Sequence, residues 1–406
     1  MVETVTPPST TICSGTTKSG AACKRKAVAG SMFCTQHGKT AAASAPKKKP
    51  VHRDVPQDID LGALDTVVKD LRKEGSSFAG APVDLTNHNP IDELQHVAEF
   101  VSDNLGRLKD MAVSSGLVEA GKFEAMAGDV LSALLSAITA MNERVSGEYE
   151  EDDFGFDQRF TEGMFPLFSL LYQYYWRVDV EGIENVPATG RGLLVSNHAG
   201  AGLPFDGAMV KSAIWKEHST PRHARILVLD WAMAMPWMSD FMKKTGQVLA
   251  CTPNALELLK RDELVGVFPE GVKGMSKPFS QRYNLERFGR GGFVRVALRT
   301  GSPIIPVAVI GSEEIYPKIG NLPFVNKLIG APFVPVTPLF PLFGIMGFIP
   351  LPAKWHIEFC EPIDVSEYPA EAADDRSLVL ELSEQIRSTI QQRLRENLLL
   401  RRTPFW

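Results

Sequence analysis

Leu193-Leu194-Val195-Ser196-Asn197-His198 decides the fold, because an apolar run ends abruptly on a polar pair. Leu264-Val-Gly-Val-Phe268 changes in the same way before Pro269-Glu270-Gly271, and two more runs are apolar throughout, 226–229 and 304–310. Such runs predict strands that are buried on both faces of a parallel sheet. Helical patterns lie between them, near 207–216, 253–261 and 286–299. We therefore predict an α/β domain over 154–365, with a central, mostly parallel sheet flanked by helices.

His198 lies where the first of these strands ends, which is the usual place of an active site in an α/β sheet. Asp206 follows after seven residues, at the start of the next predicted helix. A neutral imidazole can accept a proton from an alcohol, and a carboxylate on its other nitrogen fixes the tautomer. Gly200, Gly202 and Pro204 prevent a regular helical turn, so the loop must fold back to join the pair. A histidine that only packs or caps is the alternative.

The second strand end carries groups suited to binding. Glu270 can hydrogen-bond hydroxyl groups, and Lys273 offers a cation to a phosphate. More cations follow around a Gly-rich turn: Lys277, Arg282, Arg287 and Arg290. Such a cluster suits a phosphorylated acceptor or the phosphates of coenzyme A, although each cation taken singly is typical of a solvated surface.

Three elements in this order resemble the glycerolipid acyltransferase family, typified by lysophosphatidate and glycerol-3-phosphate acyltransferases. They are Asn197-His198 with Asp206, Phe268-Pro-Glu-Gly271 and Ile305-Pro-Val307, and the resemblance covers about 154–362. It implies that His198 is a general base with Asp206 as its partner. The acyl group would pass directly from a thioester, on coenzyme A or acyl carrier protein, to a glycerolipid hydroxyl such as that of lysophosphatidate, without a catalytic cofactor. The predicted substrate-binding residues are Asn197, Glu270, Gly271, Lys273, Arg282, Arg287 and Arg290.

Two departures from this family leave other functions open. The usual spacing between His and Asp is four residues, and an Arg usual in an intermediate block is absent near 246–252. A longer loop that ends Pro-x-Asp resembles a branch that forms acylglycerols and wax esters. A catalytically inactive lipid-binding scaffold is the second alternative. A serine hydrolase is disfavoured, because the sequence has no Gly-x-Ser-x-Gly elbow.

The N-terminal region predicts a metal site. Its potential ligands have the spacing C-x9-C-x10-C-x2-H and are Cys13, Cys23, Cys34 and His37. Three thiolates and an imidazole make a closed tetrahedral site for structural Zn²⁺, so we predict a zinc-stapled module over 10–38. Unpaired thiols in a disordered tail are the alternative. Beyond it we predict a flexible linker over 39–57, a helical region over 58–147 and a C-terminal amphipathic helix over 374–402.

Charge and hydropathy predict where the protein resides. Residues 1–50 hold eight Lys and Arg against Glu3 alone, a charge of +7 in a chain of −5. This tail suits contact with lipid, nucleic acid or protein, or else serves as a solvated linker. Without a signal peptide or an apolar run long enough to span a bilayer, we expect a cytoplasmic protein that associates peripherally with membrane lipids. Three apolar segments are candidates for membrane contact, with a core or an acyl-chain tunnel as the alternative: 164–176, 339–349 and the cluster of Trp231, Met233, Met235, Trp237 and Met238.

Overall fold

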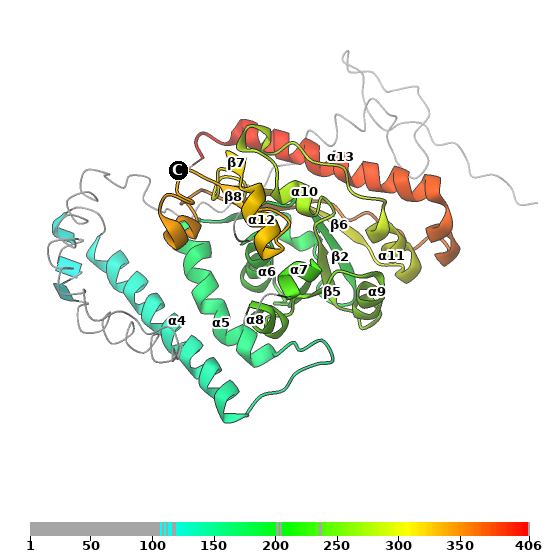
Figure 1. Ribbon diagram of the computed structural model, residues 1–406. Coiled ribbons are helices and arrows are strands. Elements are labelled where there is room, and N and C mark those ends of the chain that lie inside the picture. The colour runs from blue at the N-terminus through cyan, green and yellow to red at the C-terminus, as the bar shows by residue number, and fades with distance from the viewer. Residues whose placement is uncertain are drawn as a thin grey trace, which may run out of the picture. The chain divides into compact units, whose positions relative to one another are not determined.

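The computed structural model describes residues 106–107, 109–110, 113–115, 119–199, 203, 205–234 and 238–404. The predicted zinc module, the linker and residues 58–105 of the predicted helical region lie outside these residues. From 154 onward the described chain is built around one sheet with helices on its faces, which confirms the predicted fold class (Figure 1).

The main sheet of the described residues has the strand order β1-β9-β6-β2-β5-β3-β4. Its strands are β1 (Asp179–Glu181), β2 (Gly192–Ser196), β3 (Ala224–Val228), β4 (Val248–Leu249), β5 (Leu264–Val267), β6 (Ile304–Ile310) and β9 (His356–Phe359). Every pairing is parallel except that of β6 with β9. Consequently β2 lies at the centre, between β5 and β6, and its carboxyl end is the protected position from which His198 projects.

Side chains of β2 alternate between two cores, as the two-residue period of a strand requires. Leu193 and Val195 pack in one core, under α9 (Thr252–Lys260), α11 (Gly292–Thr300) and α13 (Arg376–Leu400). Leu194 packs in the other, with α6 (Phe205–Glu217). The structure corrects the predicted helix over 286–299: α11 begins only at Gly292, because Gly289 and Gly291 have positive φ angles of 48° and 74°.

The predicted helical region contains α4 (Ala120–Ser146), which packs against α5 (Gln158–Leu170). Within the described chain, α4 is the one helix that is long and apolar enough to cross a bilayer. In its apolar 18-residue stretch 39% is buried inside the protein, and the core helix of a soluble protein can have the same length and hydropathy. After α5 a π-helical turn, Leu171–Tyr175, leads to β1. Phe165, Tyr172 and Trp176 are buried, so these aromatic residues of the 164–176 stretch belong to the core.

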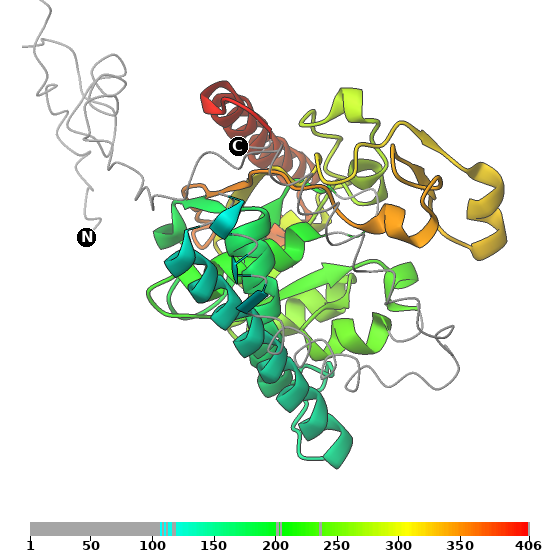
Figure 2. The same ribbon diagram turned by 90° about the vertical axis from the view of Figure 1, so that its left-hand side faces the viewer.

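A long excursion, residues 315–355, separates β6 from β9. It contains β7 (Gly320–Asn321), α12 (Pro323–Ile329), β8 (Pro335–Val336) and a 3-10 turn, Gly344–Phe348. β7 and β8 pair as a small antiparallel hairpin. The view of Figure 2 shows α12, in yellow, and the orange 3-10 turn projecting at the same side of the domain.

Candidate active site

The structure joins the two residues predicted as a general-base pair. His198 follows β2 and Asp206 lies in the first turn of α6, with 2.7 Å between His198 Nδ1 and Asp206 Oδ2. The backbone N–H of Ala199 donates to the same oxygen at 2.9 Å, and that of Gly207 donates to Oδ1 at 2.9 Å. The longer loop therefore folds back, and its ends are fixed by one buried carboxylate.

The His198 ring has one nitrogen left for a substrate. Its Nδ1 faces the Asp206 carboxylate, which can only accept, so the geometry assigns the ring proton to Nδ1 and a lone pair to Nε2. Among the described residues Nε2 has no hydrogen-bond partner. The ring lies against Phe268, with 4.7 Å between ring centroids, and its side chain is 12% exposed. This is the arrangement that a general base needs.

Asn197 connects two strands. Its amide nitrogen donates to the Val309 carbonyl at 2.9 Å, and its amide oxygen accepts from the Val309 N–H at 2.8 Å. The side chain is fully buried. The Asn197 side chain thus links the end of β2 to β6, one residue before His198.

Glu270 supports the backbone of the catalytic loop. Its Oε1 accepts from the His198 N–H at 2.9 Å, and its Oε2 accepts from the Glu286 N–H at 2.7 Å. The side chain is fully buried and lies 3.2 Å from Lys277 Nζ. Both carboxylate oxygens are therefore used within the protein. The sequence suggested hydroxyl binding by Glu270; its observed contacts are those of a positioning residue.

Lys277 is enclosed between two carboxylates. Its ammonium lies 3.2 Å from Glu270 and 3.1 Å from Glu313, and it donates to the Asn284 carbonyl at 3.1 Å. With 3% of its side chain exposed, it is not among the cations open to a phosphate. Glu313 also accepts from the Tyr283 N–H. The cluster of Glu270, Lys277 and Glu313 thus holds one more acidic than basic group behind the His198 loop.

We expect this cluster to make stability depend on pH. Burial raises the pKa of Glu313 to about 7 from its ordinary 4.5, and the charge of Glu270 adds to this effect while Lys277 opposes it. The folded protein therefore keeps a proton that the unfolded chain has released, and this contribution is full below pH 4.5 and lost as the pH rises through 7. Glu313→Gln should remove up to about 3 kcal/mol of the pH dependence of the unfolding free energy.

Urea unfolding between pH 4.5 and 8 measures this difference. The quantity to compare is the slope of the unfolding free energy against pH, because any effect of the substitution that does not depend on protonation shifts both ends of the range alike. Parallel curves for the wild type and Glu313→Gln would contradict the assignment.

Gly274 is a site residue that the sequence did not reveal. It lies in the short helix α10 (Val272–Met275) after Gly271. A Cβ atom on Gly274 would lie 2.7 Å from Glu270 Cβ, 3.0 Å from the His198 carbonyl oxygen and 3.1 Å from His198 Cβ. The backbone of α10 therefore lies so close to His198 and Glu270 that no side chain fits at position 274. In the sequence, Gly274 is noticeable only as a second glycine soon after Gly271. It has no reactive side chain, so the sequence alone gave no reason to assign it to the site.

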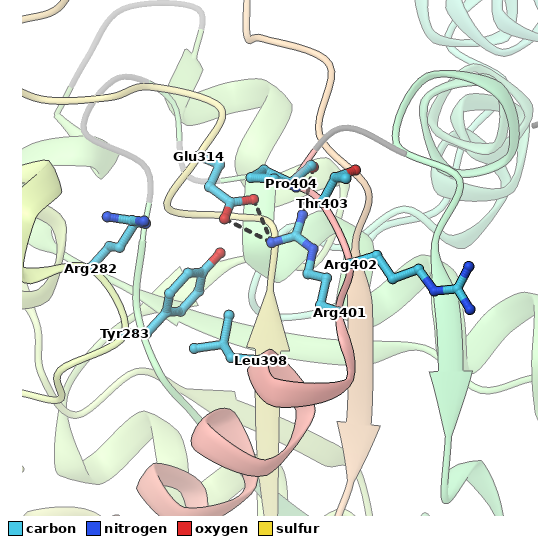
Figure 3. A pocket seen from close by; sticks show the side chains of 8 residues that line it. All are labelled: Arg282, Tyr283, Glu314, Leu398, Arg401, Arg402, Thr403 and Pro404. Atoms are coloured by element: carbon cyan, nitrogen blue, oxygen red, sulfur yellow. Dashed lines mark hydrogen bonds and ion pairs between the residues drawn. The ribbon is translucent and has the colours of Figure 1, made fainter. Parts of the chain in front are cut away.

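The remaining predicted cations are exposed: Lys273, Arg282, Arg287 and Arg290. Arg282 lies over the Phe279 ring, 4.3 Å from its centroid, and borders a cavity of about 400 Å³ beside the end of α13. Figure 3 shows the Arg401 guanidinium directed at Glu314, whereas Arg282 and Arg402 point elsewhere. The structure thus joins His198, Asp206 and Glu270 in one network, and binding of a phosphate by the arginines stays a prediction.

A histidine held by a carboxylate at the end of a central strand, with its second nitrogen left for a substrate, is an arrangement that can take a proton from an alcohol. The chain belongs to the acyltransferase family, whose model matches residues 177–310. An uncharacterized protein of Mycobacterium tuberculosis is 44% identical over 284 residues, which are 70% of this chain and 79% of the relative.

Two enzymes with named activities are more distant. A chloroplastic 1-acyl-sn-glycerol-3-phosphate acyltransferase of Brassica napus is 30% identical over 150 residues, 36% of this chain and 41% of that protein. The solved structure of the 1-acyl-sn-glycerophosphate acyltransferase PlsC from Thermotoga maritima matches with a TM-score of 0.40 and 16% identity, over 68% of this chain and 99% of that one.

Among the described residues there is no group of three or more His, Cys, Asp or Glu side chains placed to hold a metal ion. The four predicted zinc ligands, Cys13, Cys23, Cys34 and His37, lie outside those residues, and the zinc module stays a prediction.

Proposed function

We propose that this protein transfers a fatty acyl group from an acyl thioester to a hydroxyl of a glycerolipid such as lysophosphatidate. The observation that carries this proposal is the 2.7 Å contact of His198 Nδ1 with Asp206, which leaves Nε2 as the acceptor for a proton. The similarity to a 1-acyl-sn-glycerol-3-phosphate acyltransferase supports the class of acceptor.

The reaction needs one base. Nε2 of His198 takes the proton of the acceptor hydroxyl as its oxygen attacks the thioester carbonyl carbon. Asp206 stabilises the imidazolium that forms. The carbon–sulfur bond then breaks, the acyl group stays on the acceptor oxygen, and the departing thiolate recovers the proton from Nε2. No acyl-enzyme is formed, and the donor is acyl-coenzyme A or acyl carrier protein.

A second acceptor class has its own support. The seven residues between His198 and Asp206 form a longer loop than lysophosphatidate acyltransferases usually have. The chain is also 29% identical over 160 residues to phytyl ester synthase 1 of Arabidopsis thaliana. Diacylglycerols and long-chain alcohols are therefore the alternative acceptors.

An acceptor panel tests these functions. Purified full-length protein would receive radiolabelled acyl-coenzyme A or acyl carrier protein with lysophosphatidate, glycerol-3-phosphate, diacylglycerol or a long-chain alcohol. We expect labelled phosphatidate to form fastest. Preference for diacylglycerol or the alcohol would move the assignment to the alternative, and absence of transfer to any acceptor would favour the inactive lipid-binding scaffold.

Peripheral membrane association in the cytoplasm stays part of the proposal.

A further inference from the structure

The 315–355 excursion exposes large apolar side chains. Those of Leu342 and Phe324 are 82% and 79% exposed. With four others they form what we call the apolar face: Ile319, Phe324, Leu342, Phe343, Met346 and Ile349. Phe324 lies on α12 and Met346 on the 3-10 turn, which Leu342, Phe343 and Ile349 flank, whereas Ile319 precedes β7. Figure 2 shows α12 and the 3-10 turn projecting at the same side of the domain. Monomeric soluble proteins rarely leave such surfaces uncovered unless they bind something.

The charges of this segment select the partner. From Ile315 to Ile357 the sequence has no Asp or Glu and three lysines, although the whole chain has more acidic than basic residues. Lys327 is exposed on α12. Lys318 is buried and Lys354 is paired with Asp179, so Lys327 is the exposed lysine of this segment. An apolar face with an exposed cation beside it, in a segment whose sequence has no acids, complements a bilayer whose headgroups are anionic. A second copy of this face would supply no acid to pair with Lys327, so self-association is less well matched.

Tyr316 connects this segment to the catalytic loop. Its hydroxyl donates to the Phe348 carbonyl in the 3-10 turn at 2.6 Å and is hydrogen-bonded to the backbone of Leu203, which lies between His198 and Asp206. Tyr316 and Ala199 also line one small cavity beside the base. The loop that orients His198 is thus attached to the segment that bears the apolar face.

We propose that the apolar face inserts into the surface of an anionic bilayer and places the His198 loop against the lipids. The delivery of a membrane-bound acceptor to His198 rests on the proposed function, whereas the docking itself does not. Burial of these apolar side chains among the lipids supplies the free energy of binding.

Vesicle flotation with two matched variants tests this surface. Leu342→Glu/Phe343→Glu changes the apolar face, and Leu399→Glu/Leu400→Glu changes two leucines at the end of α13 that are 87% and 79% exposed. Both variants add two negative charges and keep the basic N-terminal tail. With full-length protein and vesicles of phosphatidylcholine and phosphatidylglycerol, we expect the first variant to bind at least about tenfold more weakly and the second to bind within about twofold of wild type.

Three results would overturn the proposal: wild-type protein that stays with the unbound fraction, equal loss of binding in both variants, or a wild-type dimer in light scattering that only the first variant dissociates. Thermal unfolding of both variants checks that they fold. A water-dispersed short-chain acceptor separates docking from catalysis, because the first variant should acylate it at the wild-type rate. Vesicle binding by a protein that acylates no acceptor would uphold docking and refute the proposed function.

Discussion

Replacing His198 with alanine is expected to lower the rate of acyl transfer by about 10²–10⁴-fold, because the acceptor hydroxyl loses its base. The measurement is kcat with radiolabelled donor at saturating acceptor. The side chain is largely enclosed and contacts Phe268, so the variant leaves a small cavity, and its thermal unfolding should be recorded as well.

Asp206→Asn isolates the orientation of the base. An amide can donate to His198 Nδ1, which would move the ring proton to Nε2 and leave that nitrogen unable to accept. We expect a loss of kcat comparable to that of His198→Ala with little change in KM. Transfer that survives either substitution at the wild-type rate would refute the assigned base.

The second large effect is expected at a residue that touches no substrate. Gly274→Ala would place a methyl group 2.7 Å from Glu270 Cβ and 3.0 Å from the His198 carbonyl oxygen, so the catalytic loop must shift. A displacement of about 1 Å at a reacting group can cost about 10²-fold in rate. We therefore expect kcat to fall by about 10- to 100-fold, while overpacking lowers the stability by about 1–3 kcal/mol.

Gly292→Ala is the matched control. Gly292 is the first residue of α11, and a Cβ atom there meets no neighbour within 4 Å. This variant should keep the wild-type kcat and the wild-type stability or slightly more. Equal kcat values for Gly274→Ala and Gly292→Ala would mean that α10 does not position the base.

The central strands could be predicted because strands that are buried on both faces consist of consecutive apolar residues. β2, β5 and β6 are continuous apolar runs, and each lies close to its predicted position. The two edge strands, β1 and β4, and the interior strand β9 were not predicted. β1 and β4 are only three and two residues long, and β9, His356–Phe359, alternates polar and apolar residues. Its antiparallel sense depends on the path of the 315–355 excursion, which local sequence does not encode.

Within the site, the residue types indicated the chemistry but not the orientation of each side chain. The pair of His198 with Asp206 followed from the need of an imidazole for a carboxylate. Glu270 looked available because acidic side chains are mostly exposed. Its burial is compensated by Lys277, seven residues later, which also pairs with Glu313 after a different strand, and only the fold brings these charges together.

The amide of Asn197 has a consequence for how this sequence is interpreted. It presents a donor to the carbonyl and an acceptor to the N–H of one residue of β6, Val309, which an aspartate, with two acceptors, cannot do. Glutamine has the right groups on a side chain one methylene longer. The identity of the residue before the base is therefore set by the architecture of the scaffold, and it carries no information about which alcohol is acylated. Enzymes of different acceptor preference can share the Asn-His pair, and selectivity has to be sought on the surfaces around the opening to Nε2.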